Sequence, residues 1–339
     1  MALPERDSRR IVIAGASSLV GIELKSLLEE SRLADADLRL LDEDVAVGTL
    51  TEAGGEAAVI QPVEEGSFHR AKFVFFTGSP EFARANLAAA RESGARIIDL
   101  SASEGELKKS VVWFPKLDRL LNREFPKDAP LYDIPSPAGT AASALTLALA
   151  KLGLRELSFV AFLAASEAGR LGVEELETQT GQLLSFQGVG QPIFDAQVAF
   201  NMLDRYGVAS RVRISALRDR IRREVRAAAS EKTGEKGTLP AIQVLHAPVF
   251  YGNTFTACAD LDPAISADRV AEICQDAGFV IAADGEPGPS NVSAAGERSM
   301  LLAKPDSDPA RPGAWWFWGA ADNIRLPAAN AVKLAEMLL

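Results

Sequence analysis

Hydrophobic runs and amphipathic segments alternate through the first 140 residues. Buried strands are expected at 10–14, 37–41, 73–76 and 96–100. Helices are expected at 20–30, where apolar residues recur at helical spacing, and at 80–93, which Gly94 closes. This alternation predicts an α/β domain with a doubly wound parallel sheet.

The second half has a different order of elements. Strands are expected at 157–164, 242–249 and 253–260, and helices at 173–185, 214–230, 266–277 and 323–339. The polar segments 231–238 and 303–313 are expected to be loops, and Trp315 to Trp318 a buried strand that fills a core or an interface. The pattern predicts an α+β second domain.

Composition narrows the functional classes. The chain of 339 residues has a formal net charge of -10, which argues against nucleic acid as a partner. No apolar run reaches the roughly 18 residues of a membrane span, and no signal peptide is recognised, so a cytoplasmic protein is expected. With two cysteines and two histidines, neither a disulfide framework nor a Cys/His metal site is expected.

The segment IVIAGASSLVGIEL, residues 11–24, reads as strand, turn and helix. Gly15 and Gly21 stand where a dinucleotide-binding loop has glycines, with Ser18 at the middle position. Ser17 and Ser18 are suitable phosphate donors at a helix N-terminus. Asp42, at the end of the second strand, would bind a ribose hydroxyl and repel a 2′-phosphate, which favours NAD over NADP. A turn that binds nothing and a solvated acidic loop at 42–44 are the alternatives.

A second turn enters a helix at IPSPAGTAASALT, residues 134–146. Its N-terminus could hold a small anion or a carbonyl oxygen, yet the turn contains no Cys, His, Lys or acid. A hydroxyl nucleophile at Thr140 or Ser143 would need His246 as its base. The alternative is an ordinary strand histidine.

Other reactive or charged residues have simpler interpretations. Cys258 and Cys274 are expected to be packed thiols rather than nucleophiles. The run from Arg218 to Arg226 is expected to be a solvated helix face.

Several segments, in order along the chain, resemble the aspartate-semialdehyde dehydrogenase family. GASSLVG resembles its nucleotide loop, and FFTGSPEFARANLAAARESGARIIDLSA resembles its third-strand segment through an Asp-x-Ser-x turn. AASEAGRLGVEELETQT, VAFNMLDRYG, HAPVFYGNTF and GAADNIRLPAANAVKLAEML resemble segments of its second half. The resemblance covers nearly the whole chain.

This resemblance implies a domain organisation. Residues 1–138 would form a Rossmann-like NAD(P)-binding domain and 139–322 an α+β catalytic and dimerisation-like domain, with 323–339 returning to the first domain as a helix. A homodimer is implied.

The same resemblance implies cofactor-binding positions. They are Gly15, Ala16, Ser17, Ser18, Leu19, Val20, Gly21, Asp42, Gly78, Ser79, Ser166, Glu167, Gly169 and Asn323.

The family's reaction is reductive dephosphorylation of an aspartyl phosphate through a Cys thioester, with hydride from NADPH. Its catalytic positions are altered here. The nucleophile falls on Gly139, the acid/base His on Asn253 and a substrate-binding Arg on His246. The Gln that orients the Cys falls on Leu163, and the phosphate-binding Arg falls on Glu104. The chain therefore resembles a degenerate, Usg-type branch that lacks the catalytic Cys and His.

Three hypotheses follow. The first is a binding or regulatory protein that keeps the fold, the dimer and nucleotide binding without thioester chemistry. The second is a carbonyl reductase that needs no covalent intermediate, with Glu167 and His246 lining its pocket. The third is an active aspartate-semialdehyde dehydrogenase. The small-molecule ligand itself is not indicated by the sequence.

Overall fold

The computed structural model describes residues 10–43, 46–53, 56–103, 110–233, 238–283 and 285–339. Glu104 and Asp44, together with residues 234–237 of the expected polar loop, lie outside the described residues. The chain divides into two compact units. The first comprises residues 1–113, 125–134 and 327–339, and the second comprises 114–124 and 135–326.

The first unit is built on a six-stranded sheet in the order β2-β1-β5-β6-β8-β7. Every strand pair in it is parallel. Its strands are β1 (Arg10–Ala14), β2 (Asp37–Leu41), β5 (Ala71–Phe76), β6 (Arg96–Asp99), β7 (Val111–Val112) and β8 (Leu131–Asp133). The helices are α1 (Leu19–Glu29), α2 (Pro80–Glu92) and most of α8 (Arg325–Met337). A small hairpin of β3 (Leu50–Ala53) and β4 (Glu56–Val59) was not predicted.

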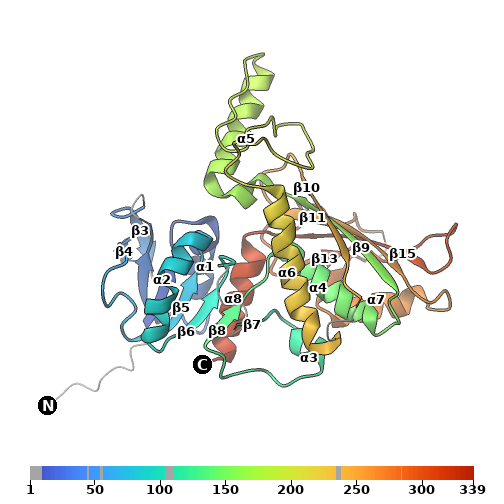
Figure 1. The fold of residues 1–339 in the computed structure, drawn as a ribbon, viewed down its shortest axis with the longest axis horizontal. Coiled ribbons are helices and arrows are strands. Elements are labelled where there is room, and N and C mark those ends of the chain that lie inside the picture. The colour runs from blue at the N-terminus through green and yellow to red at the C-terminus, as the bar shows by residue number, and fades with distance from the viewer. Residues whose placement is uncertain (1–9, 44–45, 54–55, 104–109, 234–237, 284) are drawn as a thin grey trace. The chain divides into compact units, whose positions relative to one another are not determined.

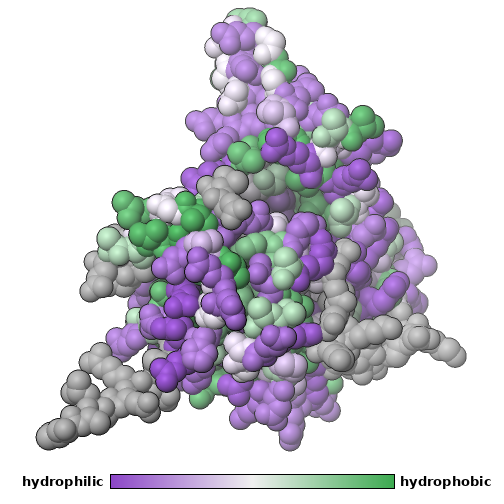
Figure 2. Space-filling view, turned by 60° about the vertical axis from the view of Figure 1, so that its left-hand side comes forward, coloured by the Kyte–Doolittle hydropathy of each residue, from purple (hydrophilic) through white to green (hydrophobic). Residues whose placement is uncertain are grey.

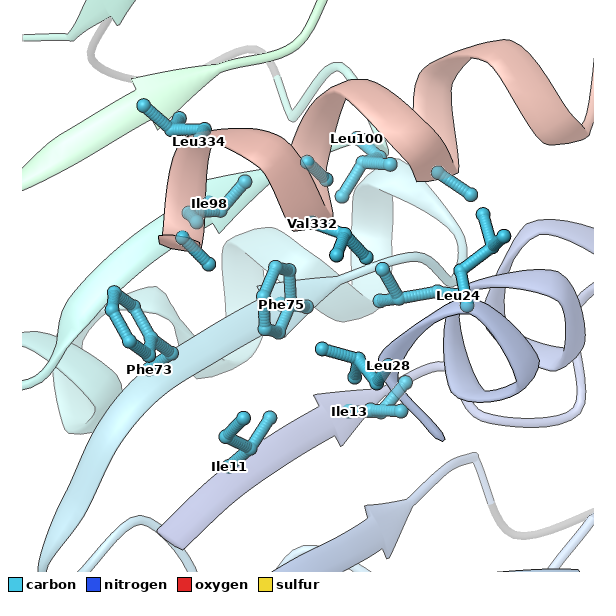
Figure 3. Close-up of a cluster of buried hydrophobic side chains, with 14 of the residues drawn as sticks. Ile11, Ile13, Leu24, Leu28, Phe73, Phe75, Ile98, Leu100, Val332 and Leu334 are labelled. Carbon is cyan, nitrogen blue, oxygen red and sulfur yellow. The ribbon is translucent and has the colours of Figure 1, made fainter. Parts of the chain in front are cut away.

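Side-chain alternation along the parallel strands creates a core on each face of this sheet. Ile11, Ile13, Phe73 and Phe75 point to one face, where α1 and α8 cover them (Figure 3). Val12, Val74 and Phe76 point to the other face, which α2 covers. The C-terminal helix is therefore part of the first unit's core, with Ala328, Ala331, Leu334 and Ala335 fully buried.

The second unit is built on a seven-stranded mixed sheet. Its strands run in the order β10-β9-β11-β15-β13-β12, and β14 pairs with β15. They are β9 (Glu156–Leu163), β10 (Ala241–His246), β11 (Asn253–Asp260), β12 (Phe279–Ile281), β13 (Met300–Leu302), β14 (Asp306–Ser307) and β15 (Ala314–Ala321). The segments η2 (Ala165–Ala168), α3 (Leu117–Leu121), α4 (Pro137–Ala150), α5 (Gly169–Leu184), α6 (Ile214–Thr233) and α7 (Ala267–Asp276) complete the unit.

One face of this mixed sheet is covered and the other is open. Helices α4, α6 and α7 contact the sheet on the covered face (Figure 1). Strand β11 alternates between buried and partly exposed residues along its whole length. The fold class predicted from the sequence, a doubly wound parallel domain followed by an α+β domain, is confirmed.

Two local expectations need correction. The run Trp315 to Trp318 is in a strand but is not fully buried: Trp315 and Phe317 face the core, whereas Trp316 and Trp318 are 46% and 40% exposed. The reason is strand periodicity, which sends alternate side chains to the open face. The expected loop at 303–313 contains the short strand β14, which pairs with β15.

Exposed hydrophobic residues are distributed over the surface. On the face drawn in Figure 2, they form several separate groups among hydrophilic residues. Helix α5 projects from the sheet of the second unit (Figure 1), and the segment that follows it carries the almost fully exposed Phe186 and Val208.

Candidate functional site

The turn after β1 is held against the turn after β5 in the first unit. Gly15 has a φ of 103°, and a Cβ there would lie 2.0 Å from the backbone nitrogen of Gly78. Gly21, in the first turn of α1, would place a Cβ 2.4 Å from the carbonyl oxygen of Gly15. All three glycines therefore have a steric role in bringing these two turns together.

Asp42 fixes the first of these turns. Its carboxylate accepts hydrogen bonds from the backbone N–H of Ser17, at 2.6 Å, and of Glu43, at 2.8 Å. The Ser17 N–H is thus bonded within the protein. Ser18 caps α1 by accepting the Gly21 N–H at 2.9 Å. The structure therefore places Asp42, which follows β2, against the loop that contains Gly15 and Ser17.

Ser79 and Glu43 line the neighbouring turn. The Ser79 hydroxyl caps α2 by accepting the Phe82 N–H and donates to a carboxylate oxygen of Glu43. A second acid therefore lies beside the predicted site. Of the other predicted positions, Ala16 is buried, and Leu19 and Val20 are half-buried in the first turn of α1.

The N-terminus of α4 in the second unit is occupied by a side chain of this chain. Ser136 caps the helix, and its hydroxyl accepts the Gly139 N–H at 3.1 Å. The Glu224 carboxylate accepts the Ser136 N–H at 2.9 Å through Oε1 and the Ser136 hydroxyl at 2.6 Å through Oε2. Arg220, one turn earlier on α6, pairs with Oε1 of Glu224 at 2.8 Å. The carboxylate of Glu224 therefore takes the place of the anion that was predicted to bind at this helix end.

These contacts leave no room for a side chain at Gly139. A Cβ at this position would lie 1.8 Å from Oε2 of Glu224 and 3.0 Å from the Ser136 hydroxyl. Any side chain at residue 139 requires the carboxylate to turn away and to give up a short hydrogen bond. The glycine therefore fits the position that Glu224 takes.

Glu167 lies at the centre of an amide network. Its Oε1 accepts the Asn253 side-chain N–H at 2.8 Å and that of Asn323 at 3.4 Å. Asn253 is fixed in turn because its Oδ1 accepts the Ala164 N–H. Asn323 exchanges hydrogen bonds with Ser166 and accepts the Gly252 N–H. The predicted residues Ser166, Glu167 and Asn323 are thus brought together, whereas Gly169 only begins α5.

Burial raises the pKa of Glu167 above its usual range. The Glu224 carboxylate acts in the same direction, whereas the Asn253 and Asn323 amides and the Arg220 charge act against it. The carboxyl group consequently keeps its proton to a higher pH than a solvated glutamate.

A small pocket lies beside Glu167 and Arg220. Its polar wall consists of Ser136, Glu167, Arg220 and Asn253, and its apolar wall consists of Ala138, Leu163, Leu217 and Ile221. About 10 Å³ is open to the centre of a water molecule, which is room for one group of that size. Leu163 and Asn253, which the resemblance aligned with catalytic positions of the family, both line this pocket.

His246 is buried among aromatic rings. Its Nδ1 lies 3.0 Å from the Tyr206 hydroxyl, and its ring contacts Phe194 and Tyr206. Burial lowers its pKa to about 4, against a backbone hydrogen bond with Val198, so the ring is neutral at pH 7. His246 does not line the pocket with Glu167, and the expectation that both would do so is wrong.

The alternative nucleophiles are not activated. The hydroxyls of Thr140 and Ser143 are buried, and neither they nor Nε2 of His246 makes a hydrogen bond to the described part of the chain. Burial raises the pKa of Cys258, which lies on β11, and raises that of Cys274 to about 12. Both thiols are therefore poor thiolates at neutral pH.

Among the described residues, no three His, Cys, Asp or Glu side chains are grouped so that they could hold a metal ion. No helix in that part of the chain is long and apolar enough to cross a bilayer.

The sequence did not indicate Arg220 and Glu224 as site residues. They belong to the run 218–226, which was interpreted as a solvated face. Ile221 and Val225 are buried in that run, and α6 packs against α4. The i,i+4 spacing of Arg220 and Glu224 on a helix with a buried stripe was the available signal.

The chain belongs to the semialdehyde dehydrogenase family. Residues 145–326 match the model of its dimerisation domain, and residues 10–119 match the model of its NAD binding domain.

Individual relatives agree with this assignment. A USG-1 protein homolog of Pseudomonas aeruginosa is 29% identical, with 97% of each chain covered. The solved structure of a probable aspartate-semialdehyde dehydrogenase from the same species is 29% identical, with a TM-score of 0.82 over 97% of this chain and 98% of that one. An aspartate-semialdehyde dehydrogenase with NADP from Candida albicans is 14% identical, covers 98% of both chains at a TM-score of 0.68, and shows the shared fold.

Proposed function

We propose that this protein is a semialdehyde dehydrogenase family member that binds a small molecule without forming a thioester. The arrangement at α4 supports the proposal most directly. Gly139 has no nucleophile, and the place of its missing side chain lies 1.8 Å from a carboxylate oxygen of Glu224. The resemblance aligns Asn253, His246 and Leu163 with other catalytic positions of the family, and His246 is neutral and does not line the pocket beside Glu167.

A carbonyl reductase without a covalent intermediate is the alternative. The observation in its favour is Glu167, a carboxyl group with a raised pKa in the wall of a pocket. Its weakness is the position of His246, which the hypothesis also needs.

The first prediction concerns turnover. With aspartate semialdehyde and phosphate, the protein does not reduce NAD or NADP, and with a panel of small aldehydes it does not oxidise NADH or NADPH, at rates near the usual 1–10³ s⁻¹ of enzymes. Absorbance at 340 nm checks this, with the Vibrio cholerae aspartate-semialdehyde dehydrogenase as the positive control. Turnover of aspartate semialdehyde at such a rate would overturn the proposal. Turnover of another aldehyde that is lost in Glu167→Gln would establish the reductase instead.

We further propose that the first unit binds NAD in preference to NADP. Asp42 and Glu43 place two carboxyl groups beside the loop formed by Gly15, Ser17 and Ser79. A 2′-phosphate in this position would be repelled, whereas a ribose hydroxyl could donate to Asp42.

The second prediction is a difference in thermal stabilisation. NAD at a hundredfold excess over its dissociation constant stabilises the protein by about 2.7 kcal/mol, and NADP at the same concentration does so less. Differential scanning fluorimetry measures both. Equal melting temperatures with and without NAD, or a larger shift with NADP, would refute this preference.

A homodimer formed through the open face of the second unit's sheet is the third element of the proposal. Trp316 and Trp318 project from this face, with the ring of Phe162 6.2 Å from that of Trp318. Large aromatic side chains on an uncovered sheet face are typical of interfaces. A second copy of the chain would cover them.

The third prediction tests this face. Trp316→Glu places a charge on it and should convert the wild-type dimer into a monomer, because an unpaired charge at a buried interface is costly. Light scattering after gel filtration measures the mass. Leu50→Glu, at another exposed apolar position (74% exposed) in the first unit, is the matched control and should remain a dimer. A dimeric Trp316→Glu, or a monomeric wild type, would contradict the proposed interface.

A further inference from the structure

Helix α5 and the segment that follows it form an arm on the second unit. This arm consists of α5 (Gly169–Leu184) together with residues 185–213, which lead back to α6. Figure 1 shows α5 projecting beyond the sheet. The arm is joined to the β10 edge of that sheet, where the backbones of Leu203 and His246 exchange hydrogen bonds of 3.3 and 2.8 Å. It therefore extends the second unit beyond one edge of its sheet.

The most exposed hydrophobic side chains in the described part of the chain lie on this arm. Phe186 is 100% exposed and Val208 is 98% exposed, and no other large hydrophobic residue among those described exceeds 76%. Leu184, Phe200 and Met202 on the same arm are exposed as well. Apolar surface that is gathered on one projecting element is typical of a protein–protein interaction site.

Phe186 stands where the backbone favours glycine. It follows Ser185, the C-cap residue of α5, and its φ of 57° lies in the left-handed region. Its N–H donates to the carbonyl oxygen of Leu183 at 3.1 Å, and the N–H of Gln187 donates to that of Gln182 at 2.8 Å, the pattern with which a helix usually ends on a glycine. A bulky residue is strained in this conformation, and burial does not stabilise a ring that is fully exposed. Strain of this kind points to a function outside the fold of the single chain.

Side chains of α5 hold the rest of the arm in place. Gln179 accepts the N–H groups of Val198 and Ala199 through Oε1 at 2.8 and 3.2 Å, and the Glu175 carboxylate accepts the N–H of Ile193. The arm also has a small apolar core that includes Leu176, Ile193, Phe194, Val198 and Ala199. The exposed side chains therefore project from a backbone that buried contacts already fix, so little conformational freedom has to be lost on binding.

The exposed part of the arm carries little charge. Among residues 184–208, Asp195, Asp204 and Arg205 are the charged ones, whereas 24% of the whole chain is charged. The Asp195 carboxylate accepts the N–H of Ala209 at 3.0 Å, and Asp204 pairs with Arg205 at 2.9 Å. Two copies of a chain with a formal net charge of -10 repel each other, so contact between them is favoured where the surface charge is lowest. The arm meets this condition.

We propose that the arm packs against a second copy of this chain, with Phe186 and Val208 as its buried apolar contacts. The inference rests on the homodimer of the proposed function, and it adds a second contact region to the open sheet face that carries Trp316. The residues that match the family's dimerisation domain, 145–326, include the entire arm. In a two-fold pair both copies contribute the same residues, so each of these side chains is buried twice.

Hydrogen exchange of the full wild-type chain locates the contact. It is measured at protein concentrations above and below the dissociation constant of the dimer, which sedimentation velocity provides. We expect the amides of residues 184–190 and 205–210 to exchange more slowly at the higher concentration. Residues 62–70 of the first unit should exchange equally at both concentrations. This comparison needs no variant, so it does not depend on how a variant folds.

Two variants test the side chains themselves. Phe186→Gly removes the ring and suits the left-handed backbone, so it should raise the dissociation constant of the dimer roughly tenfold or more without weakening the fold. Val208→Asp places a charge in the contact and should raise it at least as much. Leu50→Asp, at an exposed apolar position in the first unit, is the matched control and should dimerise as the wild type does. Circular dichroism verifies the fold of all three variants.

Three results would overturn the inference: unchanged dissociation constants in both arm variants, an equal loss in Leu50→Asp, or equal exchange of the arm at both concentrations. A dimer that does not respond to the arm variants would leave the arm to a different partner. If Trp316→Glu is monomeric while the arm variants remain dimers, the homodimer stands without the arm. A monomeric wild type refutes the homodimer and the arm contact together.

Discussion

The bond between the Glu224 carboxylate and the N-terminus of α4 organises the second unit's site. A helix end with uncompensated N–H groups attracts an anion, and here α6 supplies it. Arg220 holds the carboxylate from the other side. Because these contacts fill the space next to residue 139, glycine fits there and a side chain would displace the carboxylate.

This constraint changes what the site can do. The family's chemistry places a thiolate at such a helix end, where the dipole and a nearby base stabilise it. Here the carboxylate of Glu224 is the group that this helix end stabilises. The two cysteines have raised pKa values and do not line the pocket. What is left is a small pocket lined by the carboxyl group of Glu167, which accepts hydrogen bonds from Asn253 and Asn323.

The two units differ in how their sites use acids. In the first, Asp42 fixes the β1–α1 turn through the Ser17 N–H, so a carboxyl group shapes the loop that would meet a nucleotide. In the second, Glu224 fills a helix end and Glu167 lines a pocket. The acidic character of the chain is therefore built into both candidate sites.

The fold was predictable because its signals are local. Apolar periodicity marked the strands around Gly15 and the helices that follow them, and the buried alternation of β11 was also visible. The hairpin of β3 and β4 was missed because each strand is only four residues long and shows no clear alternation of apolar and polar residues. The half-exposed Trp316 and Trp318 were misjudged because composition suggested burial where strand periodicity decides.

The candidate site was predictable only in part. The resemblance singled out Gly139 and Asn253, but the contact between Ser136 and Glu224 could not be predicted, because it joins residues 88 positions apart and leaves no local pattern. His246 was misplaced for the same reason: its ring direction depends on Phe194 and Tyr206, which come from another segment of the chain.

The central claim is that Gly139 and Glu224 share one space, and a double-mutant cycle on unfolding stability measures it most directly. Gly→Ala inside a helix normally gains roughly 0.5–1 kcal/mol. Gly181 on α5 has no atom within 4 Å of its would-be Cβ, so Gly181→Ala is the matched control and should show this gain. Gly139→Ala should lose stability in the wild type and regain it in a Glu224→Ala background, with a coupling of about 1 kcal/mol or more. Additive effects, with Gly139→Ala behaving as Gly181→Ala does, would contradict the account.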